Sequence, residues 1–279
     1  MKDANQHFLL RFLDPDGVAI VGASNNPAVS NYFLVANLVN LGFPGKIYPV
    51  NPKETEILGL RAYASIQDIN GPVDLAVIGV SHIRVPGILR ECIQKGIQRV
   101  TIIAGGFSEA GENGKKAQNE IRQTVKDHDI RAIGPNALCP INVAAHFCIS
   151  FNPVSAIPPG GLSLIFQSGL YEPRSSWLLT DFNYHLNKLI DLGNKMDINE
   201  VDALAIQLPP MAFLHPQGLL EALGNQVTGR KPIAFWMPGM EPGRNEILQS
   251  LEEKGVVVFP SPEQAIRALS ALHTFSRRI

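Results

Sequence analysis

Short apolar runs alternate with longer amphipathic stretches along the first half of the chain. The apolar runs are rich in Val and Ile and too short for buried helices, which favours buried strands. The strands expected are Gly17–Ala23, Lys46–Val50, Val73–Val80, Arg99–Ala104 and Ile130–Ile133. The helices expected between them cover Ser30–Leu41, Val85–Lys95 and Gly114–Asp127. Apolar strands that alternate with helices predict a parallel α/β sheet covered on both faces.

A second alternation of the same kind follows a proline-rich stretch. Residues 137–161 show no clear period and are interpreted as a connector. Further strands are expected at Leu162–Gln167, His185–Leu192, Val201–Leu208, Lys231–Met237 and Gly255–Phe259. Further helices are expected from Ser168-Gly169 to about Phe182 and over Pro216–Gln226, Pro242–Lys254 and Pro262–Phe275. The pattern predicts two α/β domains, over residues 1–140 and 141–279.

Composition narrows the class of protein. Of the 279 residues, 45% are hydrophobic and 18% are charged, which supplies ample material for a core. The formal net charge is −1, so no basic field favours nucleic acid or an anionic membrane surface. No run approaches the roughly 18 apolar residues of a membrane span, and the first residues contain no apolar signal core. Three cysteines without metal-ligand spacing suit a reducing compartment, so a cytoplasmic protein is expected.

Two loops in the first domain indicate a ligand that carries phosphate. The first predicted strand ends in Gly22-Ala-Ser24 and continues through Asn25 towards a helix. Unpaired N–H groups at such a strand-to-helix turn, together with the helix dipole, favour an anion. The second strand ends in Asn51-Pro52-Lys53, which adds a mobile cation. The three-glycine dinucleotide motif is not present, so a turn without a ligand stays open as the alternative.

The other three strands of this domain also end in polar or glycine-rich residues. Val80-Ser81-His82 ends the third strand, Gly105-Gly106 follows the fourth, and Asn136 follows the fifth. The carboxyl ends of parallel strands lie on one rim of a sheet, where ligands bind. Glycines on this rim let a flat group approach the backbone. We therefore expect one ligand site along the rim, with His82 as a candidate contact.

The second domain offers another strand-to-helix turn, at Gln167-Ser168-Gly169. The helix N-terminus there is a candidate site for an anion or an acyl carboxylate. No G-x-S-x-G elbow surrounds Ser168, which disfavours a serine nucleophile. No pair among the seven histidines has metal-ligand spacing, so no metal site is expected. No residue is assigned a catalytic role.

The first domain contains four motifs in a fixed order: Val21-Gly-Ala-Ser24, Gly45-Lys-Ile-Tyr-Pro-Val-Asn-Pro-Lys53, Ala104-Gly-Gly-Phe-Ser-Glu109 and Gly134-Pro-Asn136. Together they resemble the α subunit of the NDP-forming acyl-CoA synthetases, relatives of succinyl-CoA synthetase. The resemblance implies a Rossmann-like CoA-binding domain. It implies that the CoA phosphates are held by Gly22, Ala23, Ser24 and Lys53. It also implies that the nucleotide and pantetheine run past Val80, Ser81, Gly105, Gly106 and Asn136.

The second half resembles the same family in parts. Phe166-Gln-Ser-Gly169 and Leu192-Gly-Asn-Lys-Met-Asp197 are similar to the opening of the family's flavodoxin-like second domain. From Val201 onward the chain is similar to the end of the family's third domain, so the flavodoxin-like domain would be internally shortened. The family's phosphorylated histidine belongs to the missing stretch, in a Ser-His-Thr-Gly type motif that this sequence lacks. A phosphoryl relay through this chain is therefore not expected.

The sequence leaves three hypotheses on function. The first is a protein that binds coenzyme A or acyl-CoA, as a subunit or accessory factor of a synthetase-like assembly. The second is an active acyl-CoA ligase or transferase subunit whose catalytic groups come from a partner ATP-grasp chain. The protein partners expected are an ATP-grasp β-type subunit or a second copy of the chain in a homo-oligomer. No ATP-grasp region is expected here, because the two domains fill the chain. The third, an NAD(P)-binding oxidoreductase, is disfavoured because the second strand ends in Asn51-Pro52-Lys53, without an acidic residue for the ribose.

Overall fold

The computed structural model describes residues 9–138, 140–154, 159–166, 186–198, 234–236 and 257–259. The chain divides into two compact units, Met1–Ala203 and Leu204–Ile279. In the second unit, β12 (Ala234–Trp236) pairs in parallel with β13 (Val257–Phe259), inside two of the predicted strands. The predicted helices of the second half lie outside the described residues. The domain boundary expected at residue 140 stays a prediction.

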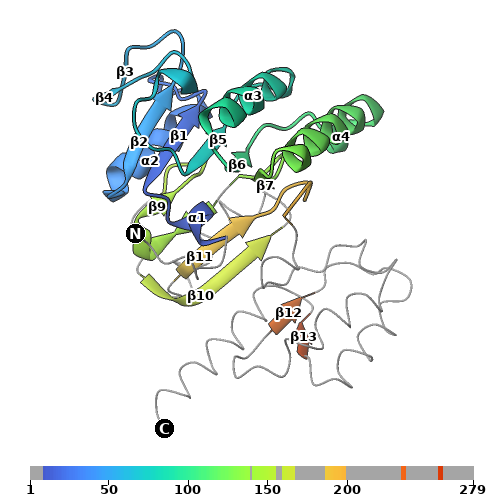
Figure 1. Ribbon diagram of the computed structural model, residues 1–279. Coiled ribbons are helices and arrows are strands. Elements are labelled where there is room, and N and C mark those ends of the chain that lie inside the picture. The colour runs from blue at the N-terminus through green and yellow to red at the C-terminus, as the bar shows by residue number, and fades with distance from the viewer. Residues whose placement is uncertain are drawn as a thin grey trace. The chain divides into compact units, whose positions relative to one another are not determined.

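A five-stranded parallel sheet forms the centre of the first unit (Figure 1). Its strands are β1 (Gly17–Val21), β2 (Lys46–Val50), β5 (Leu75–Ile78), β6 (Arg99–Ile102) and β7 (Arg131–Ile133). They stand in the order β2-β1-β5-β6-β7, and every adjacent pair is parallel. The predicted parallel α/β sheet is confirmed, and each observed strand lies within a predicted one.

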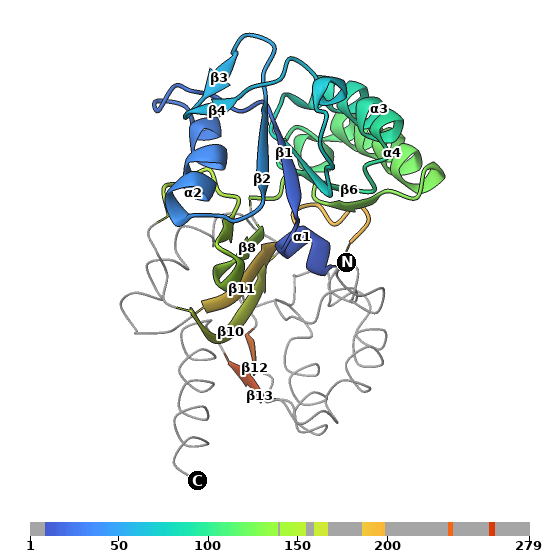
Figure 2. The ribbon, with the colours of Figure 1, turned by 60° about the vertical axis from the view of Figure 1, so that its left-hand side comes forward.

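Helices cover both faces of this sheet (Figure 2). They are α2 (Phe33–Leu41) on one face, and α3 (Val85–Lys95) and α4 (Glu112–Asp127) on the other. Side chains alternate along each strand, so Ala19 and Val21 join the core beneath α3 and α4 while Val18 and Ile20 face the opposite side. A left-handed glycine ends α2 at Gly42 (φ 71°), as a helix C-cap requires.

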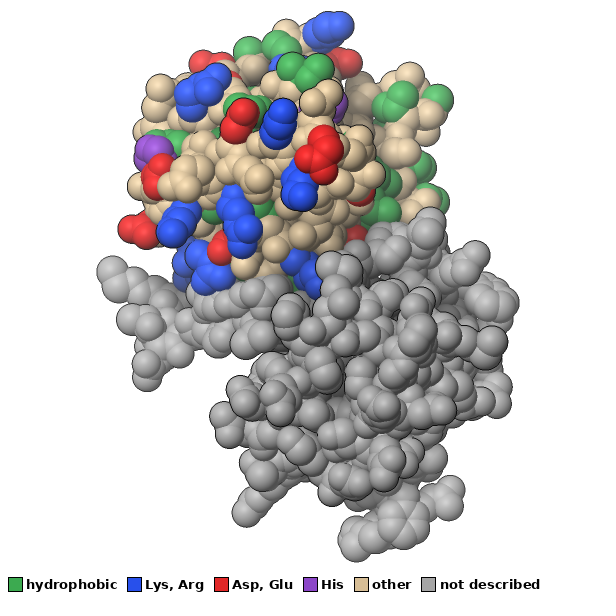
Figure 3. Space-filling view, turned by 90° about the vertical axis from the view of Figure 1, so that its right-hand side faces the viewer, with side chains coloured by type: hydrophobic (Ala, Val, Ile, Leu, Met, Phe, Trp, Pro, Cys, Tyr) green, Lys and Arg blue, Asp and Glu red, His purple; other side chains and the backbone are tan. Residues whose placement is uncertain are grey.

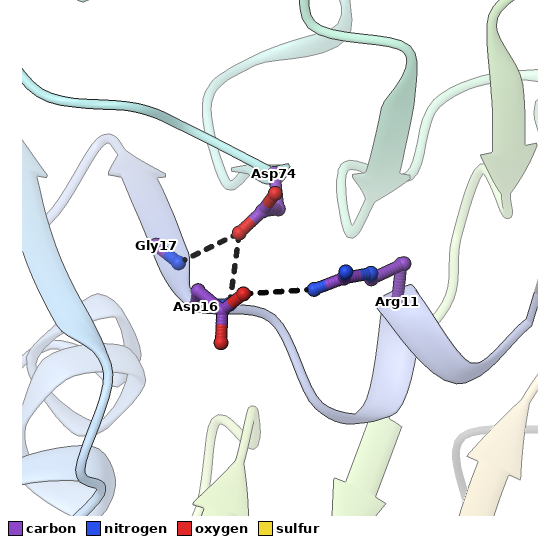
Figure 4. Close-up of polar contacts among 4 residues, drawn as sticks. All are labelled: Arg11, Asp16, Gly17 and Asp74. Atoms are coloured by element: carbon purple, nitrogen blue, oxygen red, sulfur yellow. Dashed lines mark hydrogen bonds and ion pairs between the residues drawn. The ribbon is translucent and has the colours of Figure 1, made fainter. Parts of the chain in front are cut away.

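The amino end of the sheet is tied together by a carboxylate (Figure 4). Asp74 Oδ2, directly before β5, accepts hydrogen bonds from the backbone N–H groups of Asp16 (2.8 Å) and Gly17 (3.0 Å). Arg11, in the short helix α1 (Leu10–Leu13), donates to Asp16 Oδ2 at 2.9 Å. These contacts fix where β1 enters the sheet beside β5.

The stretch interpreted as a connector contains strands of its own. A second sheet of the first unit has the order β10-β11-β8-β9. Its strands are β8 (Pro140–Asn142), β9 (Phe147–Cys148), β10 (Pro159–Phe166) and β11 (Leu186–Asp191). β8 pairs antiparallel with both β11 and β9, whereas β10 and β11 are parallel. Strands of two or three residues carry too few positions to show a period, which explains why β8 and β9 were not predicted.

Segments outside the strands lie against both outer strands of the five-stranded sheet. The N–H groups of Met196 and Ile198 donate to the carbonyls of Gly134 (3.0 Å) and Ala132 (3.2 Å) along β7. Asp197 Oδ2, between them, accepts from the N–H of Ala132 at 2.8 Å. At the other edge, the N–H of Tyr63 donates to the carbonyl of Pro49 in β2 at 2.9 Å. Tyr63 follows a hairpin formed by β3 (Glu56–Ile57) and β4 (Leu60–Arg61).

The face of the described residues in Figure 3 carries charges of both signs. Lys and Arg side chains are interspersed with Asp and Glu on the face shown in Figure 3. Within the part of the chain that the structure describes, no helix has the length and apolar character needed to cross a bilayer. Cys92 and Cys148 are buried, and burial raises the pKa of Cys92 to about 12. The reducing compartment expected from the cysteines stays a prediction.

Candidate functional site

A pocket of about 370 Å³ opens at the carboxyl ends of β1, β2 and β5. Six of the predicted site residues line it: Gly22, Asn51, Pro52, Lys53, Val80 and Ser81. It is also lined by residues that were not predicted as site residues: Val21, Asn31, Val50, Ala64, Gly79, Arg84, Ile88 and Glu91. The chain leaves β1 for β2 on one side and then crosses back to β5 on the other. The pocket therefore lies at the switch point of the sheet, where open α/β sheets bind ligands.

The turn after β1 is shaped by Gly22. Its φ is +88°, and a Cβ there would stand 2.7 Å from the carbonyl oxygen of Gly79, which leaves no room for a side chain. Its N–H donates to the Val50 carbonyl at 2.9 Å, so this group is not available to a ligand. Asn31 Nδ2 bridges the carbonyls of Gly22 and Gly79, each at 2.7 Å. The carboxyl ends of β1 and β5 are thereby held together.

Donors for an anion remain further along this turn. No hydrogen bond within the described ranges uses the backbone N–H of Ser24 or Asn25. Ser24 Oγ instead accepts from the N–H of Asn26 at 3.1 Å, which shapes the turn. Ala23 is fully buried, and its carbonyl accepts from Asn51 Nδ2 at 2.8 Å. Ala23, Ser24 and Asn25 lie beside the pocket but do not line it, and their contact with a ligand stays a prediction.

The turn after β2 presents Lys53. The Asn51 side chain connects the two turns, because its Nδ2 reaches Ala23 and its Oδ1 accepts from the N–H of Lys53 at 3.0 Å. Lys53 is exposed and lines the pocket. An ammonium group on a flexible stem, fixed only at its backbone, suits a phosphate that arrives from solvent.

The wall contributed by α3 was missed by sequence reasoning. Arg84, Ile88 and Glu91 follow a spacing of four and three residues, which places them on one helix face. Once the end of the preceding strand was assigned to a site, this spacing could have indicated that the three residues face that site. Glu91 Oε2 accepts from Ser65 Oγ at 2.6 Å and from the N–H of Ile66 at 3.1 Å. Its carboxylate is thus committed to the turn that starts at Ser65.

Four predicted residues gather elsewhere on the rim. A Cβ on Gly105 would stand 3.3 Å from Asn136 Oδ1, and a Cβ on Gly106 would stand 2.6 Å from His82 Nδ1. The His82 ring also meets the Phe107 ring edge-on, with centroids 6.0 Å apart. His82, Gly105, Gly106 and Asn136 are therefore neighbours, but they do not line the pocket at β1, β2 and β5. Their part in ligand binding stays a prediction.

Glu109 occupies the N–H groups of this glycine loop. Its Oε1 accepts from the N–H groups of Gly106 (2.5 Å) and Phe107 (3.2 Å), and its Oε2 accepts from Asn194 Nδ2 (2.5 Å). Burial acts to raise the pKa of Glu109, but the hydrogen bonds from Asn194 and the backbone outweigh it and lower that pKa below its ordinary value. The carboxylate clasps the loop after β6 to the segment after β11.

The clasp predicts a pH dependence of stability. Because the folded-state pKa of Glu109 is lowered, its stabilising contribution is present above the ordinary Glu range and is lost as the pH falls through the folded-state pKa. Urea midpoints measured from about pH 7 to about pH 3 should fall less steeply for Glu109→Gln than for the parent chain. Glu112→Gln, at an exposed position of α4, serves as the control. Parallel curves for Glu109→Gln and the parent would contradict this role.

The second candidate anion site, Gln167, Ser168 and Gly169, lies outside the described residues. Groups of three or more metal-ligating side chains do not occur in the described ranges. Because this absence concerns the described residues alone, the expectation that the protein has no metal site stays a prediction.

Known proteins resemble the chain in both sequence and structure. Residues 16–142 match the family of the CoA binding domain. Acetate--CoA ligase [ADP-forming] II of Archaeoglobus fulgidus is 36% identical over 88% of this chain and 35% of its own length. Acetate--CoA ligase [ADP-forming] II subunit alpha of Pyrococcus furiosus is 32% identical over 88% of this chain and 50% of its own length. The chain thus spans about a third to a half of these curated relatives.

A solved structure extends the similarity to the fold. The dinucleotide-forming acetyl-coenzyme A synthetase 1 of Ca. Korarchaeum cryptofilum, in complex with phosphate and ADP, superposes with a TM-score of 0.81 at 25% identity. The superposition covers 92% of this chain and 60% of that one. The pocket described above lies within the residues that match the CoA binding domain. The chain is therefore related to the ADP-forming acyl-CoA synthetases and their α subunits, and its residues 16–142 match the CoA binding domain.

Proposed function

We propose that this chain binds coenzyme A or acyl-CoA in the pocket at the carboxyl ends of β1, β2 and β5. The observation that carries the proposal is the position of this pocket at the switch point of a sheet formed by a CoA-binding domain. Lys53 and the unpaired N–H groups after Gly22 suit phosphates, and the apolar lining residues Val21, Val50, Val80 and Ile88 suit a flat base. The oxidoreductase alternative is disfavoured, because the carboxylate on the wall, Glu91, is already held by Ser65.

Calorimetric titration with CoA and with NADH tests the proposal. CoA should bind, and Lys53→Gln should weaken it by about tenfold, the effect of one charge-assisted contact to phosphate. The matched control is Lys46→Gln, because Lys46 is an exposed lysine at the amino end of β2, away from the pocket. Tighter binding of NADH than of CoA, or equal effects of the two substitutions, would refute the assignment.

Acyl-CoA ligase activity together with a partner chain is the second candidate. It is favoured by relatives whose names include "subunit alpha", which suggests that a second subunit completes the assembly in those proteins. The proposed partner is an ATP-grasp β-type subunit, which would have to bring the phosphoryl-transfer groups, since this sequence has no Ser-His-Thr-Gly motif. Incubation with radiolabelled ATP and acyl-CoA separates the two candidates. A phosphorylated band on this chain would establish a covalent role for it and refute a purely CoA-binding function.

A further inference from the structure

Arg84 is a pocket residue that the CoA-phosphate motifs do not include. It ends the 3-10 turn His82–Arg84 and directly precedes α3. Its backbone N–H donates to the Ser81 carbonyl at 2.8 Å, which fixes the turn, while its side chain is exposed at the pocket. None of the ion pairs found between described residues uses its guanidinium.

Arg84 and Lys53 lie on opposite sides of the β1 turn. Lys53 follows β2, and Arg84 follows β5, while β1 stands between these two strands. The N–H groups of Ser24 and Asn25 that lack partners belong to the β1 turn itself. If the diphosphate of a ligand lies at the β1 turn beside Lys53, Arg84 is therefore placed to contact a second negatively charged group of the same ligand.

Coenzyme A has such a second charge. Its 5′-diphosphate carries the pantetheine arm, and a separate phosphate monoester is attached to the ribose 3′-oxygen. A monoester has three terminal oxygens, and the guanidinium fork matches two of them at once, whereas an ammonium group acts as a point charge. Arginine is thus better suited than lysine to bind the monoester, whereas lysine is sufficient to contact the diphosphate.

The guanidinium of Arg84 is available to a ligand, because the acidic group on the same wall is distant and already hydrogen-bonded. The nearest acidic residue on the pocket wall of α3 is Glu91, seven residues further on and so about 10 Å along the helix axis. Its carboxylate is held by Ser65 Oγ and the N–H of Ile66. Ile88 stands between the two charges on the same face.

We infer that Arg84 recognises the ribose 3′-phosphate and makes the pocket select CoA over dephospho-CoA. This inference rests on the proposed function and adds to it the group that sets ligand specificity. Removal of the guanidinium should cost affinity only for the ligand that carries the monoester. Dephospho-CoA keeps the base, the ribose, the diphosphate and the arm, so it isolates that one group.

Titrations of the full chain with CoA and with dephospho-CoA test the inference. The parent should prefer CoA by about tenfold or more. Arg84→Gln should lose this preference by weakening CoA alone, and Arg84→Lys should restore part of it. Arg90→Gln, at an exposed arginine of α3 that does not line the pocket, should leave both affinities unchanged.

The outcomes separate the inference from the proposed function. If the parent binds CoA but prefers it over dephospho-CoA no more than Arg84→Gln does, the role of Arg84 is overturned and the proposed function stands. Equal weakening of both ligands by Arg84→Gln would place the guanidinium at the diphosphate and also overturn it. A parent that binds neither ligand would overturn the proposed function. Thermal unfolding of each variant confirms that the substitutions at these exposed positions leave the fold intact.

Discussion

Replacing Gly22 with alanine should abolish measurable CoA binding, a loss of roughly a hundredfold or more in affinity. The added Cβ would stand 2.7 Å from the Gly79 carbonyl oxygen and 2.9 Å from Val80 Cγ1. The ends of β1 and β5 would have to move apart, and residues at these ends line the pocket. The positive φ of +88° adds roughly 1–2 kcal/mol of backbone strain to any residue other than glycine. Calorimetry with CoA measures the loss, and urea unfolding measures the strain.

Gly42→Ala separates strain from the local clash. Gly42 has a similarly positive φ of +71°, but a Cβ there would have nothing within 4 Å. The two variants should therefore lose comparable stability from the backbone, while Gly42→Ala keeps the CoA affinity of the parent. If both variants bind CoA as the parent does, the turn after β1 is not part of the CoA site.

Phe107→Ala should destabilise the first unit by about 3–5 kcal/mol, the range measured for large-to-small substitutions at buried Phe. Phe107 is fully buried between the sheet and the helices α3 and α4, in the same cluster as Ile121 and Val125. The loss is a large part of the roughly 5–15 kcal/mol by which domains are stable. The urea midpoint of the full chain, followed by far-UV circular dichroism, reports it.

Ile83→Ala provides the contrast for Phe107. Ile83 is 77% exposed, so its removal leaves no cavity and returns little apolar surface to water. Its urea midpoint should stay within error of the parent. Comparable losses for the two variants would mean that the packing around Phe107 does not determine the stability of this unit.

The sequence predicted the helices and strands whose hydrophobic pattern is visible within a single segment. Lys46–Val50 and Val85–Lys95 are found with the bounds expected, because an apolar run and an amphipathic period each mark one buried face. Gly96, which directly follows the helix expected over Val85–Lys95, caps α3 at a φ of +76°. β8 and β9 could not be predicted, since each is only two or three residues long and β8 pairs with β11, more than forty residues away along the chain.

The site was predictable to the extent that strand ends define it. Gly22, Asn51 and Lys53 meet in one pocket because parallel strands bring their carboxyl ends to one rim. The order of strand ends along the rim did not reveal that Glu109 accepts hydrogen bonds from the N–H groups of Gly106 and Phe107. That contact depends on a side chain folding back over its own loop, which no sequence period encodes.

The segments along the outer strands limit how this protein can associate. At β7, the carbonyls of Ala132 and Gly134 and the N–H of Ala132 already have partners in residues 196–198. At β2, Pro49 has no N–H to donate, and its carbonyl is taken by Tyr63. An incoming strand from another molecule finds these positions occupied, so the sheet resists edge-to-edge growth into aggregates. A companion subunit would have to dock through side chains on loops or helices and could not continue the sheet at these positions.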